Sequence, residues 1–157
     1  LNVFAQPDRK FLHFVIQRYL NKMPYKIKEH IADIRIAVRG KNLEQLFTDA
    51  FLGMMYIMKP VQKFSPEKIE REISLDSMDT TALLVDFLNE TLSLANANKE
   101  SYTHVIFYKI QPESLRAKLF GVSAESFHRD VKAVTYHEAE VKQTADGAWE
   151  TTLVFDI

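Results

Sequence analysis

The stretch DIRIAVRGKNLEQLFTDAFLGMMYIMKP, residues 33–60, is the most informative about the fold because its hydrophobic period changes partway along. Over residues 34–38 apolar side chains alternate with charged or small ones, which predicts a strand with one buried face. Over residues 43–58 apolar side chains recur every three or four positions, which predicts an amphipathic helix. Asn42 can cap that helix by accepting from its first free N–H groups, and Pro60 ends it.

The rest of the chain repeats this pattern and adds strands. A second amphipathic helix is predicted over residues 81–97, capped by Asp79 or Thr80. Asp146-Gly147 predicts a tight turn that joins the last two strands as a hairpin. Further strands are predicted over residues 68–76, 104–110, 114–122, 131–142 and 148–157. The helix positions predicted to be buried are Phe47, Phe51, Met54, Leu84, Phe87, Leu88 and Leu92.

This order of elements predicts an α+β fold, in which mainly antiparallel β-sheets pack with two amphipathic helices in a single domain. A chain of 157 residues is long enough for one such domain. Residues 1–22 are interpreted as an N-terminal extension and residues 23–157 as the domain itself.

Composition and charge exclude several classes of function. The 20 Lys and Arg and the 21 Asp and Glu give a net charge of -1, which argues against strong direct binding of nucleic acid. The chain has no cysteine, so disulfides, thiolate metal sites and cysteine nucleophiles are excluded. No apolar run reaches the roughly 18 residues of a membrane span, and we expect a cytoplasmic protein.

Three groups of residues are candidates for a functional site. They are Asp33, the segment VKAVTYH from residue 131 to 137, and the pair Asp156 and Ile157 at the end of the chain. Each is also compatible with an ordinary, solvated strand. The last pair carries a side-chain carboxylate and a terminal carboxylate, which become favourable neighbours if a cation or a lysine lies between them. Oxygen ligands of this kind select Ca²⁺, Mg²⁺ or Mn²⁺ rather than zinc.

Several of these segments, taken in order, resemble the archease family. They are HIAD at 30–33, GKNLEQLFTDAFLGM at 40–54, LLVDFLNETL at 83–92, VKAVTYH at 131–137 and VFDI at 154–157. Ile31 departs from the family, which usually has threonine there. The resemblance implies an accessory protein of the GTP-dependent tRNA-splicing RNA ligase, which joins 3′-phosphate or 2′,3′-cyclic phosphate RNA ends to 5′-hydroxyl ends. It implies that the chain promotes guanylylation of that ligase and its multiple turnover without being an enzyme.

The resemblance also implies the roles of particular residues. Asp33, Asp156 and Ile157 would bind one divalent cation, with Ca²⁺ as the first expectation and Mn²⁺ or Mg²⁺ as alternatives. Lys132, His137 and His30 would contact the ligase or its nucleotide. Two other functions stay open, a small metal-dependent hydrolase and a general protein-binding chaperone. No nucleophile–base pair is evident in the sequence, which argues against the hydrolase.

Overall fold

The computed structural model of the protein describes residues 25–29 and residues 33–157. For residues 25–29 it describes the backbone alone. Within these residues the chain forms the helices α2 (Leu43–Met58) and α3 (Thr80–Asn98). The strands are β1 (Tyr25–Glu29), β2 (Asp33–Gly40), β3 (Pro60–Gln62), β4 (Lys68–Asp76), β5 (Glu100–Gln111), β6 (Ser114–Phe127), β7 (Ala133–Thr135), β8 (Lys142–Gln143) and β9 (Trp149–Asp156). The predicted extension, residues 1–22, and the candidate residue His30 lie outside the described residues.

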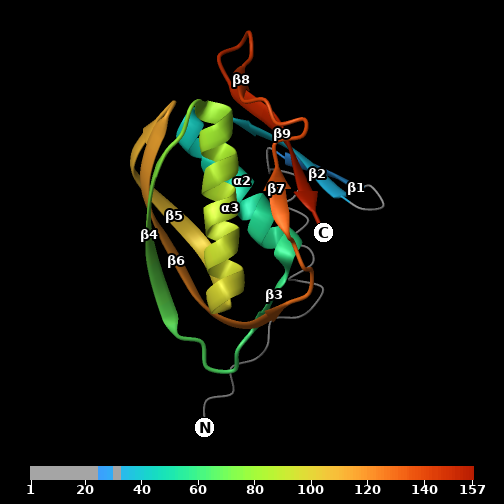
Figure 1. Cartoon of the computed structure of the whole chain (residues 1–157), viewed down its shortest axis with the longest axis vertical. Helices are drawn as coiled ribbons and strands as arrows, with labels where there is room; N and C mark the ends of the chain where they lie inside the picture. The colour runs from blue at the N-terminus through green and yellow to red at the C-terminus, as the bar shows by residue number, and fades with distance from the viewer. Residues whose placement is uncertain (1–24, 30–32) are drawn as a thin grey trace.

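The described strands form two antiparallel sheets. In the first, the order is β1-β2-β9-β7, and β8 also pairs with β9. In the second, the order is β3-β6-β4, and β5 also pairs with β6. Strands β4, β5 and β6 of the second sheet lie on the left of Figure 1, and strands β1, β2, β7 and β9 of the first sheet lie on the other side of α3. The predicted α+β class with mainly antiparallel sheets and two helices is confirmed.

Both helices begin at the side-chain caps that the sequence predicts. Asn42 Oδ1 accepts a hydrogen bond from the backbone N–H of Gln45 at 2.8 Å. Asp79 Oδ1 accepts one from the N–H of Ala82 at the same distance, so Asp79 rather than Thr80 is the cap of α3. Each cap satisfies a donor that the first turn of a helix leaves without an intrahelical partner.

The hydrophobic core lies where the inner faces of both sheets meet α2 and α3. Phe47 of α2, Phe87 of α3 and Phe107 of β5 contact one another, with ring centroids 5.5 to 6.2 Å apart. All the helix positions predicted to face the core are buried, namely Phe47, Phe51, Met54, Leu84, Phe87, Leu88 and Leu92. Aromatic pairs at such distances add to the stabilisation that burial provides.

The single strand predicted over residues 131–142 is wrong. Only β7 and the short β8 form within this range, and the chain between them leaves the sheet. Between them the chain turns: the N–H of Ala139 donates to the carbonyl oxygen of Tyr136 at 3.1 Å, and Glu138 has a φ of 61°. Side chains of α3 hold the backbone on either side of this turn, since Asn89 Oδ1 accepts from the N–H of Val134 at 2.9 Å and Thr81 Oγ1 accepts from the N–H of Val141 at 3.0 Å. The strands β1 and β3 were not predicted separately.

Neither helix of the described part of the chain is long and apolar enough to cross a membrane.

Candidate functional site

Two aspartates on neighbouring strands begin the candidate site. Asp33 opens β2, and its register partner is Asp156, which closes β9. Register partners on antiparallel strands direct their side chains to the same face of the sheet, about 5 Å apart at Cβ. Ala133 of β7 is the partner of Asp156 on the other side. The fold therefore brings Asp33 and Asp156 together at one end of the first sheet, near the label C in Figure 1.

Lys132 and Ile157 lie beside this pair. The backbone N–H of Lys132 donates to the carbonyl oxygen of Asp156 at 2.8 Å, which holds the end of β9 against the start of β7. The Lys132 ammonium donates to the main-chain oxygen of Ile157 at 3.3 Å. Lys132 is exposed, and among the described residues its ammonium forms no ion pair with Asp33 or Asp156.

Arg35 and Glu138 extend the site, and neither was selected by the sequence analysis. Arg35 lies two residues after Asp33 and so on the same face of β2. Its Nη2 is 3.9 Å from Asp33 Oδ2, and its Nε donates to Glu138 Oε1 at 3.2 Å. His137 Nε2 lies 3.3 Å from the same Glu138 oxygen. The structure thus brings His137 to Glu138 rather than to either aspartate.

Thr135 adds a further oxygen to this face. Its register partner on β9 is Val154, which lies two residues before Asp156 and so on the same face. The hydroxyl oxygen of Thr135 is buried and has no hydrogen-bond partner among the described residues. A buried polar atom without a partner is uncommon in folded proteins, and this hydroxyl is available to a water molecule or an ion at this face.

The donor chemistry of this face fits a hard divalent cation. Asp33 and Asp156 would hold it through carboxylate oxygens, and the main-chain oxygen of Ile157 lies close to the end of β9. Oxygen-only donors suit Ca²⁺, Mg²⁺ and Mn²⁺. Among the residues that the structure describes, no three His, Asp or Glu side chains gather as a metal site. The set therefore supplies two side-chain carboxylates, and a cation bound there would complete its ligand sphere with water or with groups of a partner.

Polar residues of α3 hold the segment that carries Lys132. Asn89 accepts from the N–H of Val134 and donates to its carbonyl oxygen, at 2.9 and 2.8 Å. Asp86 accepts from the Tyr136 hydroxyl at 2.7 Å, and this hydrogen bond raises the pKa of Tyr136 to about 12. The sequence analysis treated this helix as structural and missed both residues. The available signal was their spacing of three, which places the two polar side chains on one side of the helix.

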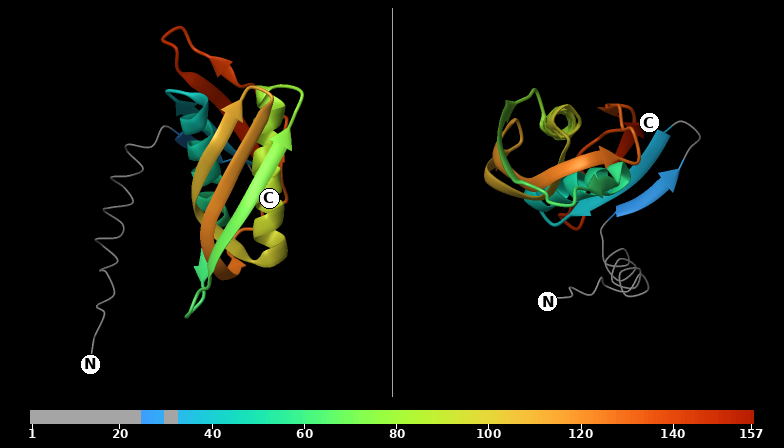
Figure 2. Two further views of the ribbon diagram at one scale, coloured as in Figure 1. Left: turned by 90° about the vertical axis from the view of Figure 1, so that its left-hand side faces the viewer. Right: turned by 90° about the horizontal axis from the view of Figure 1, so that it is seen from below.

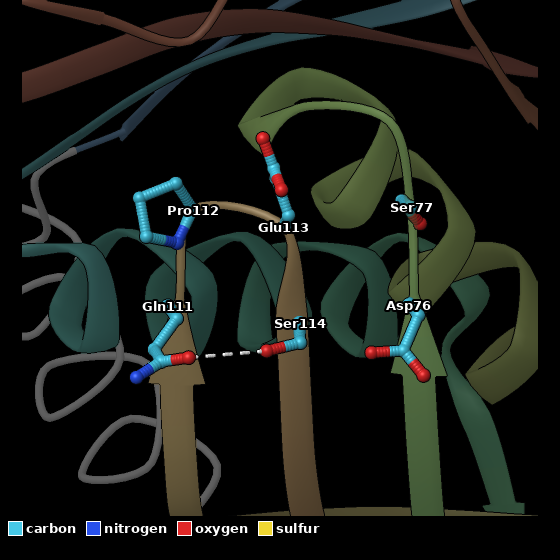
Figure 3. Close-up of a pocket in the computed structure, with 6 residues that line it drawn as sticks. All are labelled: Asp76, Ser77, Gln111, Pro112, Glu113 and Ser114. Carbon is cyan, nitrogen blue, oxygen red and sulfur yellow. Dashed lines mark hydrogen bonds between the residues drawn. The ribbon is translucent and has the colours of Figure 1, made fainter.

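A separate hollow lies at the end of the second sheet. It has a volume of about 510 Å³, and Figure 3 shows the residues that line it. They are Asp76, Ser77, Gln111, Pro112, Glu113 and Ser114. Ser114 Oγ donates to Gln111 Oε1 at 3.4 Å, and Ser77 Oγ donates to Asp86, so within the described residues neither hydroxyl is paired with a base that would make it a nucleophile. None of the residues predicted from the sequence lines this hollow.

Comparison with known proteins agrees with the resemblance seen in the sequence. The model of the archease protein family matches residues 25–157. The chain is 34% identical over 146 residues to the protein archease of Methanosarcina mazei, and the match covers 85% of this chain and 95% of that protein. It is 32% identical over 136 residues to the protein archease of Thermococcus kodakarensis, with 82% and 95% covered.

Two solved structures share the fold. The solution structure of protein 1598 of Methanobacterium thermoautotrophicum has a TM-score of 0.62 at 23% identity, and the match covers 85% of this chain and 99% of that one. The crystal structure of a Thermotoga maritima protein, described as an archease and possible chaperone, has a TM-score of 0.61 at 22% identity, with 84% and 96% covered. The family model and the curated relatives together show that this chain belongs to the archease family.

Proposed function

We propose that this protein is a non-enzymatic, metal-binding activator of a GTP-dependent tRNA-splicing RNA ligase, acting in tRNA splicing and RNA repair. It would promote guanylylation of the ligase and support multiple turnover. Membership of the archease family supports this function. The observation that carries the proposal is the pairing of Asp33 with Asp156 beside Lys132 at one exposed end of the first sheet.

The metal part of the proposal rests on the donor set. Asp33, Asp156 and the oxygen of Ile157 would hold one divalent cation, with Ca²⁺ first and Mn²⁺ or Mg²⁺ as alternatives. When bound, the cation would supply positive charge that attracts a phosphate oxygen. The guanidinium of Arg35 lies 3.9 Å from the Asp33 carboxylate and 3.2 Å from that of Glu138, and it adds positive charge beside Asp33.

Electrostatic complementarity explains how this end of the sheet could act on a ligase. A site that transfers GMP from GTP must attract phosphates and is therefore positively charged. Before a cation binds, two carboxylates at the end of a sheet meet such a site with the opposite sign, which favours encounter and fixes the orientation of the partners. Lys132 is exposed and can contact a phosphate once it leaves the Ile157 oxygen.

The test is a single-turnover guanylylation assay with the cognate ligase and GTP. Asp33→Asn, Asp156→Asn and Lys132→Ala should each keep the melting temperature of the parent. Each should lower the stimulated rate at least about tenfold, because truncating one member of a charged contact across an interface costs about 2 kcal/mol or more. Glu125→Gln, which removes an exposed carboxylate of β6, is the matched control and should stimulate as the parent does.

Calorimetry with Ca²⁺ tests metal binding separately from activation of the ligase. Both asparagine variants should bind Ca²⁺ more weakly than the parent, since a hard ion takes most of its affinity from ligand charge. If all three variants stimulate the ligase fully, the site does not act on the ligase. If the parent protein hydrolyses nucleotide in the absence of the ligase, the hydrolase function replaces this proposal. If the parent and all variants protect unrelated proteins from aggregation equally well, the chaperone function replaces it.

A further inference from the structure

The second sheet has an outer face that no helix of the described chain covers. Inward-facing residues of β4 and β6, such as Ile73, Leu115 and Leu119, are buried against the core. Their neighbours along each strand point outward, because successive side chains alternate between the two faces. The left view of Figure 2 shows this face broadside, with both helices behind it.

Aromatic side chains are exposed on this outer face. Tyr108 of β5 is 62% exposed and lies at an irregularity in the pairing of β5 with β6. The rings of His104 and Phe120 lie 5.9 Å apart, and Lys118 Nζ lies 5.8 Å from the centroid of the Phe120 ring. Tyr108 thus offers an exposed ring on which a flat ligand can stack, whereas Phe120 is half-buried.

Two cations lie directly opposite each other beside Tyr108. Lys109 of β5 and Arg116 of β6 are register partners, so their side chains share the outer face. Neither forms an ion pair with an acid in the described part of the chain, whereas Lys118 is bonded to Glu70 at 2.8 Å. Like charges placed directly opposite on a sheet repel, and an anion bound between them would relieve the repulsion.

A hollow of about 440 Å³ lies next to these cations. Its lining includes Tyr108, Arg116, Glu72 and Ser74. An aromatic ring, a guanidinium plane and two hydrogen-bonding groups are the side chains that stack on a nucleobase and bond to its edge. Glu72 would accept from the amino group of such a base.

We propose that this outer face binds a single strand of nucleic acid, with one base stacked on Tyr108 in the hollow and a phosphate between Lys109 and Arg116. The binding is independent of the Asp33–Asp156 site, which lies on the other sheet. The near-neutral charge of the whole chain limits this to a weak contact, sensitive to salt, rather than a strong grip on the backbone.

Fluorescence anisotropy with a labelled, unstructured RNA of about 12 nucleotides tests this, since known sites for single strands span about 4 to 16 nucleotides. Tyr108→Ala should weaken binding about tenfold, as expected for one lost stacking contact. Arg116→Ala should weaken binding and also lower the slope of log Kd against log salt by about 0.7, the value for one phosphate contact with a single strand. Phe64→Ala and Lys142→Ala, an exposed aromatic and an exposed cation elsewhere, are the matched controls and should bind as the parent does.

Amide chemical shifts recorded during the titration locate the strand. Shifts should concentrate over residues 104–109 and 116–120. The proposal is wrong if the parent shows no saturable binding at low salt, if the shifts concentrate at residues 132–137 instead, or if Tyr108→Ala and Arg116→Ala bind RNA as the parent does. It is equally wrong if these two variants lose binding to the ligase and keep binding to RNA, because the face would then dock a protein.

Discussion

Asp49 of α2 is a half-buried carboxylate, and its removal should stabilise the protein. One of its oxygens, Oδ2, is buried and has no hydrogen-bond partner among the described residues. Burial raises the pKa of Asp49 from 3.8 to about 6. A shift of about two units corresponds to roughly 3 kcal/mol of unfavourable free energy for the charged form, at about 1.4 kcal/mol per unit. Since Asp49 is only partly buried, we expect Asp49→Asn to raise the free energy of unfolding at neutral pH by about 1–2 kcal/mol.

The sign of the pH dependence follows from proton binding. Between pH 3.8 and about 6 the folded state binds the Asp49 proton more tightly than the unfolded state does. The contribution of Asp49 to stability therefore falls as the pH rises through this window. An asparagine side chain does not titrate, so the stability difference between Asp49→Asn and the parent should be smallest at about pH 3 and reach its plateau above about pH 6.5.

Urea unfolding at several pH values measures this difference. Other carboxylates also titrate, so the informative quantity is the difference between variant and parent at each pH. Glu90→Gln, which removes an exposed carboxylate from α3, is the matched control and should stay within about 0.5 kcal/mol of the parent at every pH. A difference that is the same at pH 4 and pH 7, or a destabilised Asp49→Asn, would contradict the role assigned to burial of this carboxylate.

Two further predictions concern stability. Phe47→Ala and Leu88→Ala should each lower the free energy of unfolding by about 2–5 kcal/mol, because both side chains are fully buried and would leave a cavity; unchanged urea midpoints would contradict the helix packing. Arg71→Ala should lower the free energy of unfolding at pH values above the ordinary glutamate pKa of 4.5. Among the described residues, it leaves the buried Glu100 carboxylate with only the Tyr102 hydroxyl as side-chain donor. Arg71 lowers the pKa of Glu100, so this loss should shrink as the pH falls below 4.5, and a loss that does not depend on pH would count against the ion pair.

The elements predicted correctly from the sequence are those whose signals are local. Alternation over residues 34–38, the helical period over residues 43–58 and the caps Asn42 and Asp79 each depend on neighbours a few positions away. Local periodicity therefore located both helices and the faces that they bury. It failed over residues 131–142, where the chain turns between Tyr136 and Ala139 and side chains of α3, 45 and 60 positions away in sequence, bond to the backbone on either side of the turn.

For the candidate site, the residue types and the segments that resemble the archease family identified Asp33, Lys132, Asp156 and Ile157 as candidates. They did not show how these residues lie relative to one another. The register of β2 against β9 makes Asp33 and Asp156 partners, although they stand near opposite ends of the printed sequence. Arg35, Glu138 and the unpartnered Thr135 hydroxyl join them only through the folding of the same sheet. Composition and spacing thus determined which chemical groups the chain carries. Strand register is a long-range property of the packed sheets, and it alone decided which of these groups meet.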